Sequence, residues 1–94
     1  MINNQLDFVT PRPVWADATD VAGDDVCAHI RDFSIGDVTL EIRREDRMVD
    51  LRTVTGQPEL VLGLGSELVS VSPEFLTRLA EQCTAAAERF ALIV

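Results

Sequence analysis

Lysine and tyrosine are absent from this chain of 94 residues, and histidine and tryptophan occur once each. Without lysine, the chain has neither a Schiff-base amine nor the lysine of a P-loop. Two cysteines, Cys27 and Cys83, cannot make a disulfide framework, and free thiols are typical of a reducing cytoplasm. No apolar run approaches the roughly 18 residues of a membrane helix, and the first residues lack a signal-peptide pattern. These absences predict a cytoplasmic protein without a membrane segment.

Bases are also scarce, because 8 arginines face 16 acidic residues and the net charge is -8. Neutralising phosphates supplies most non-specific affinity for nucleic acid, so we expect no direct nucleic-acid binding and no attraction to anionic membranes. Half of the arginines, Arg43, Arg44, Arg47 and Arg52, alternate with acids, which indicates a solvated surface of mixed sign. The acidic composition is also compatible with a protein that mimics nucleic acid and occupies the basic binding site of a nucleic-acid enzyme.

The central part of the chain alternates between apolar and polar residues. The sequence VTLEIR (38–43) alternates cleanly, which predicts a half-buried strand, and residues 44–47 read as a polar turn. A second strand is predicted over 48–54, with Val49, Leu51 and Thr53 inward, and a break at 55–58 precedes further strands at 59–65 and 67–71. Residues 1–25 are rich in proline and aspartate and are expected to be irregular, apart from a short strand at 6–10.

The C-terminal segment, residues 72–92, is predicted to be a helix. Ser72 suits the N-cap, and Pro73 follows at the first helical position, where its missing N–H costs nothing. An apolar stripe recurs at spacings of 3 and 4 residues through Leu76, Leu79, Cys83, Ala86, Phe90 and Ile93. The stripe is expected to cover the sheet, and Leu79, Ala86 and Phe90 are the candidates for contact with a partner or a second copy. The fold class is therefore α+β: one domain with an irregular acidic arm (1–25), an antiparallel sheet of three to five strands (26–71) and one packed C-terminal helix (72–92).

The segment WADATDVAGDDVCAH (15–29) holds the residues most suggestive of chemistry. As a calcium loop it fails, because anchoring Gly23 at the sixth position leaves Asp20 as the only acid among positions 1, 3, 5 and 12. As a zinc site it falls short, since Cys27 and His29 form one pair where structural zinc needs four ligands. On a strand these two residues would nevertheless share a face and could touch one ion.

No catalytic motif is complete elsewhere. A nucleophile, a base and an orienting acid can be drawn from Cys27 or Cys83, His29 and several aspartates, but no spacing positions them. The stretch GLGSEL (63–68) lacks the glycine two residues past Ser66 that a nucleophile elbow needs. The sequence therefore predicts neither a catalytic site nor a cofactor.

Trp15 lies in the acidic arm beside Pro13 and Val14. A single tryptophan in a chain poor in aromatics either holds the arm against the sheet or anchors a partner, because tryptophan is enriched at interface hot spots. Both roles remain open on the sequence.

Several short motifs together resemble a diffuse group of small, uncharacterised actinobacterial and actinophage proteins. They are Pro13-Val14-Trp15, the aspartate-rich run to Asp25 and His29, VTLEIR, and Val71-Ser72-Pro73-Glu74 with LAEQCTAAAERF. The chain departs from that pattern at Ala16, where the group has cysteine after the tryptophan. The resemblance implies the fold and weakens a metal site, and it implies no biochemical activity.

The sequence favours a small non-catalytic binding or regulatory protein, phage-encoded in one interpretation, that acts through protein–protein contacts as a homodimer. Its candidate partner-binding residues are Trp15, Leu79, Ala86 and Phe90. The alternative is a metal-binding or hydrolytic protein that uses Cys27, His29 and a nearby aspartate, and the third reading is the acidic mimic of nucleic acid.

Overall fold

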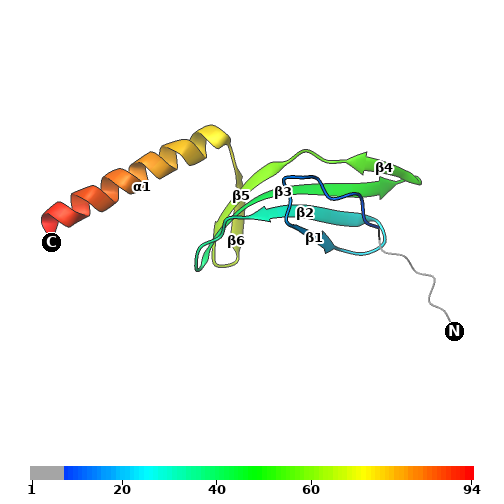
Figure 1. Cartoon of the computed structure of the whole chain (residues 1–94), viewed down its shortest axis with the longest axis horizontal. Coiled ribbons are helices and arrows are strands. Elements are labelled where there is room, and N and C mark those ends of the chain that lie inside the picture. The colour runs from blue at the N-terminus through cyan, green and yellow to red at the C-terminus, as the bar shows by residue number, and fades with distance from the viewer. Residues whose placement is uncertain (1–7) are drawn as a thin grey trace.

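The computed structural model describes residues 8–94, which form a six-stranded antiparallel sheet followed by one C-terminal helix (Figure 1). The elements are β1 (Ala18–Val21), β2 (Val26–Asp32), β3 (Val38–Val49), β4 (Arg52–Thr55), β5 (Glu59–Leu64), β6 (Glu67–Val71) and α1 (Pro73–Ile93). The order across the sheet is β1-β2-β3-β5-β6, and β4 also pairs with β3. The predicted α+β class is confirmed, with one strand more than the upper end of the expected range.

The N-terminal segment contains a strand that the sequence did not predict. β1 pairs antiparallel with β2 and places Thr19 opposite His29. The arm that the sequence predicts over residues 1–25 is therefore shorter, and from here on the name denotes residues 8–16, which precede β1. The expected strand at 6–10 is not formed by Phe8–Thr10, and residues 6 and 7 lie outside the described part of the chain. Phe8 is buried and donates its backbone N–H to the Gly23 carbonyl (3.4 Å), so it anchors the start of the arm.

β3 is one strand of 12 residues, and it runs straight through positions 44–47, where the sequence predicted a turn. That prediction was wrong because the charges in the middle of the strand pair with one another, and Asp46 is fully buried. The turn comes instead at Asp50 and Leu51, whose φ angles of 51° and 63° are both positive, as a two-residue type I′ hairpin requires. Leu51, predicted to point inward, is 93% exposed at this turn.

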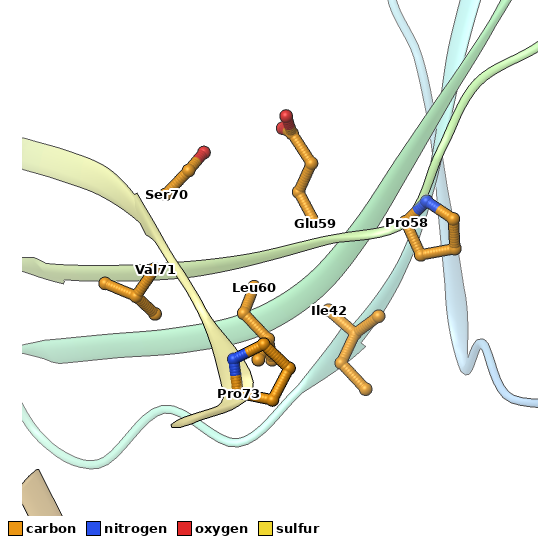
Figure 2. Close-up of a pocket in the computed structure, with 7 residues that line it drawn as sticks. All are labelled: Ile42, Pro58, Glu59, Leu60, Ser70, Val71 and Pro73. Atoms are coloured by element: carbon orange, nitrogen blue, oxygen red, sulfur yellow. The ribbon is translucent and has the colours of Figure 1, made fainter. Parts of the chain in front are cut away.

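One face of the sheet, which we call the mixed face, has a polar end and an aliphatic end. Antiparallel register and side-chain alternation place Cys27, His29 and Asp46 at the polar end, beside Thr10 of the arm. The aliphatic end consists of Val38, Leu40, Ile42, Leu60, Leu62, Leu64, Val69 and Val71. Figure 2 shows Ile42 and Leu60 together near Pro73, whereas Glu59 and Ser70 point away from them.

The helix begins as its sequence predicts. The backbone N–H of Phe75 donates to Ser72 Oγ (3.0 Å), and Pro73 occupies the first turn. Thr77 and Thr84 donate their hydroxyls to carbonyls one turn earlier, which removes the need for a partner outside the helix. The axis of α1 then leads away from the strands (Figure 1), and no residue of the helix is buried.

A bulge separates β4 from β5 on their shared neighbour β3. Asp46 is opposite Thr55 and Arg43 is opposite Glu59, so two residues of β3 face the three residues 56–58. Gly56 is required there because a Cβ atom would lie 2.1 Å from the Glu45 carbonyl oxygen. Pro58 is tolerated in the bulge, where it has no ladder hydrogen bond to lose.

The variant Gly56→Ala is expected to lose about 2 to 4 kcal/mol of unfolding free energy, because its methyl group collides with backbone that cannot rotate away. Urea denaturation followed by circular dichroism measures the loss. Gly36→Asn is the control, since Gly36 has φ 58° and open space around it, and asparagine tolerates that conformation. Equal destabilisation of the two variants would contradict the close approach at Gly56.

Candidate functional site

The polar end of the mixed face is a fully buried cluster of Cys27, His29 and Asp46, each with 0% of its surface exposed. β2 contributes the first two and β3 contributes the aspartate, which stands directly opposite Cys27 in the register. Cys27 Sγ lies 3.9 Å from His29 Nε2, and His29 Nε2 lies 3.6 Å from Asp46 Oδ2. We call these three residues, with Thr10, the polar cluster. The structure therefore unites the two residues that the sequence paired and supplies the aspartate that it left unspecified.

Asp46 is held by donors from three parts of the chain. Arg44 binds it with two hydrogen bonds, Nε to Oδ1 (2.9 Å) and Nη2 to Oδ2 (2.7 Å). The backbone N–H of Gly56 donates to Oδ1 (3.2 Å), and the Thr10 hydroxyl donates to Oδ2 (2.5 Å). Burial alone would raise the pKa of Asp46, but these hydrogen bonds outweigh it and the pKa is lowered. The carboxylate is therefore ionised and compensated in the folded chain.

His29 is neutral and makes a hydrogen bond at each ring nitrogen. Thr10 Oγ1 lies 2.7 Å from Nε2, and Thr19 Oγ1 lies 2.9 Å from Nδ1. Because the Thr10 hydroxyl proton goes to Asp46, Nε2 must carry the ring proton, and Nδ1 accepts from Thr19, which itself accepts from Arg12 Nε (3.0 Å). Burial lowers the pKa of His29. The nearby positive charges of Arg44 and Arg12 lower this pKa further, and the negative charge of Asp46, which acts in the opposite direction, does not bring it back to the ordinary value.

The polar cluster does not have the geometry of a hydrolytic triad. In such a triad the base contacts the nucleophile through one ring nitrogen and the orienting acid through the other. Here Cys27 and Asp46 both lie on the Nε2 side of His29, and Thr19 takes Nδ1. The side chains of all three residues are also shielded from solvent, which leaves a substrate no route to the thiol. The observed contacts give no support to the hydrolytic half of the alternative function.

Every buried polar side-chain atom in the described residues has a hydrogen-bond partner, so the polar cluster is internally satisfied. Sequence reasoning missed Asp46 and Thr10 as members of it, and it missed Arg44 as the side chain that pairs with Asp46. The available signal is the pair of matching spacings, Cys27-x-His29 and Arg44-x-Asp46, each of which puts two side chains on one face of a strand. The pairing register that brings the two strands together is a tertiary property and cannot be read from either segment alone.

The second region of interest is apolar and is formed by the aliphatic end and α1. Leu79 and Cys83 of the helix face Leu62 and Val69 of the sheet across a cleft of about 500 Å³. A neighbouring cleft of about 410 Å³ lies at the start of the helix, next to Ile42 and Leu60 (Figure 2). Leu79 is thus the predicted partner residue that also borders the sheet.

The other predicted partner residues lie in two places, with Ala86 and Phe90 one turn apart on the apolar stripe of α1 and Trp15 in the arm. Ala86 is exposed, and Phe90 is 64% exposed near the free end of the helix. Trp15 is partly buried in the arm, in the turn in which the Ala16 N–H donates to the Pro13 carbonyl (3.1 Å). Since Phe8 is the buried aromatic residue of the arm, holding the arm does not depend on Trp15 alone.

Replacing Arg44 with alanine is expected to cost about 3 kcal/mol of unfolding free energy, because it leaves the Asp46 carboxylate buried without its main partner. Arg47→Ala is the matched control on the same strand. Its pair with Glu45 is largely exposed, and such pairs contribute about 0.5 kcal/mol or less. Chemical denaturation of both variants compares the two costs, and equal losses would contradict the special role of Arg44.

Acidification is expected to destabilise the fold through His29. Its pKa is lowered from the ordinary value of 6.5, so the unfolded chain binds the proton more tightly. The stabilisation of the fold by neutral His29 is fully present above pH 6.5, the ordinary pKa that applies in the unfolded chain. It is lost as the pH falls from 6.5 through the lowered pKa of His29 in the folded chain. Urea titrations between about pH 8 and pH 5.5 avoid most carboxyl titration and measure this slope. His29→Gln removes the only imidazole, and an unchanged slope in that variant would refute the assignment.

Within the described residues, no helix combines the length and the apolar character of a membrane span. No protein-family model, curated protein or solved structure matches the chain. The resemblance to small actinobacterial and actinophage proteins therefore stays a prediction, and function has to be inferred from the contacts of the chain itself.

Proposed function

We propose that this protein is a small non-catalytic binding protein of the cytoplasm that acts through protein–protein contact and assembles as a homodimer. The observation that carries the proposal is the state of α1: an amphipathic helix of 21 residues in which no residue is buried. Helices in proteins owe most of their stability to packing of the apolar face, so the stripe of this helix calls for a partner. The two free cysteines, Cys27 and Cys83, are consistent with a reducing compartment.

The exposed area of the chain supports a partner as large as a second copy. It exposes 7450 Å², whereas a compact monomer of the same mass exposes about 5400 Å². The described chain contributes to this surplus through α1, none of whose residues is buried, and an interface of standard size needs only ~800 Å² from each partner. A small chain gains core most readily by dimerisation.

The charge pattern of α1 leaves its apolar stripe free for a second helix. Glu74, Glu81 and Glu88 recur every seven residues on the opposite side of the helix from the stripe. Two copies can therefore approach along their stripes without bringing these carboxylates together, despite the acidic net charge. The stripe spans too few heptads for an independent coiled coil, so we place the aliphatic end of the sheet in the same interface.

Light scattering coupled to size-exclusion chromatography tests the proposal, with an expected mass of twice the monomer. Leu79→Asp should shift the protein to monomer, because a carboxylate then enters the contact between the helix, the sheet and the second copy. Thr84→Asp is the control: it adds the same charge to an exposed position of the same helix and should leave the dimer intact. A wild-type protein that remains monomeric at high concentration would refute the homodimer.

A further inference from the structure

We propose that the polar cluster is a binding site for a divalent transition-metal ion of the zinc class, held by Cys27 Sγ, His29 Nε2 and Asp46 Oδ2. The three donor atoms lie within 4.8 Å of one another. Thiolate, imidazole and carboxylate are ligands that zinc takes in proteins, and three protein ligands leave a fourth position for water. This inference goes beyond the interaction surface, and neither proposal rests on the other.

The spacing of the donor atoms suits an ion at their centre. The distances are 3.9 Å between Cys27 Sγ and His29 Nε2 and 3.6 Å between His29 Nε2 and Asp46 Oδ2. Zinc–ligand bonds at tetrahedral angles put neighbouring ligand atoms about 3.3 to 3.6 Å apart. These two edges of the ligand triangle therefore need to shorten only slightly, which rotamer adjustment on two adjacent strands can supply.

The outer atoms of the imidazole and the carboxylate are already held in place. His29 Nδ1 lies against Thr19, which Arg12 holds from the other side. Asp46 Oδ1 accepts from Arg44 Nε and from the Gly56 N–H. Metal sites orient their ligands through contacts of this kind. In this chain they direct Nε2 and Oδ2 toward the same point as the Cys27 thiol.

Thr10 Oγ1 lies at that point of convergence. It is 2.7 Å from His29 Nε2, 2.5 Å from Asp46 Oδ2 and 3.4 Å from Cys27 Sγ. These are hydrogen-bond distances, and a hydroxyl group and a metal ion cannot share the position. The ion therefore displaces the Thr10 hydroxyl and replaces its hydrogen bonds with coordinate bonds.

Binding releases one proton. As the metal–sulfur bond forms, the S–H bond of Cys27 breaks and its proton goes to water, because the thiolate is the ligand. The His29 ring stays neutral: its proton leaves Nε2, which takes the metal, and Nδ1 becomes the donor to Thr19.

Cobalt(II) titration of the Cys83→Ser chain tests the site without disturbing the polar cluster. Cys83 is exposed on α1, so Cys27 is then the only thiol in the chain. We expect one ion per chain, a thiolate-to-cobalt charge-transfer band in the near ultraviolet and intense visible bands of low coordination number. Zinc should displace the cobalt and shift the ring-proton resonances of His29, the only histidine. A pale six-coordinate spectrum without the charge-transfer band would overturn the proposal.

Two further variants locate the ligands. Cys27→Ser in the wild-type background keeps Cys83, and it should weaken zinc binding by more than about 100-fold, since the loss of a supporting contact alone costs up to that much. Thr10→Ala should bind zinc at least as tightly as wild type, because the ion no longer competes with a hydroxyl group. Circular dichroism confirms that each variant is folded. Unchanged affinity in Cys27→Ser, or weaker affinity in Thr10→Ala, would contradict the assigned geometry.

Discussion

The buried carboxylate of Asp46 is the interaction on which the rest of the sheet depends. An ionised group without exposed surface must be compensated by donors, and here the donors come from the arm, from β3 itself and from the bulge after β4. The same side chain therefore fixes where the arm crosses the sheet and where the strand beside β3 breaks. Gly56 takes part in both features: its backbone N–H binds the carboxylate, as that of any residue except proline could, and only its missing side chain, which admits the Glu45 carbonyl, requires glycine.

The sequence predicted the elements whose signals are local. The Ser72-Pro73 start of the helix, the alternation of VTLEIR and the break at residues 55–58 all depend on residues within a few positions of one another, and each is present. The turn predicted at 44–47 lies inside β3 because a run of charged residues indicates a solvent-exposed turn only when the charges do not pair with one another. Arg44 and Asp46 compensate each other inside the strand, and the positive φ at Leu51 shows that tertiary pairing overrides an unfavourable turn residue.

The candidate sites divide in the same way. The apolar stripe of the helix was predictable from its period, including Leu79, because the period is a property of one segment. The polar cluster was half predictable: Cys27 and His29 share a strand face by spacing, but their partner Asp46 is reached only through the register between β2 and β3. Thr10 carried no signal at all, since a threonine between prolines and apolar residues has no distinguishing pattern.

The two ends of the mixed face differ in what they still lack. At the polar end every buried polar atom in the described chain has a partner, so an ion can enter only by replacing bonds that already exist. At the aliphatic end the side chains form no hydrogen bonds that a partner would have to replace, and no residue of the bordering helix α1 is buried. Burying the apolar surface is favourable with any partner that fits its shape. At the polar end, binding is favourable only for a ligand that suits the three donor atoms. Assembly is therefore expected to depend on area and fit, and metal binding on the identity of three atoms.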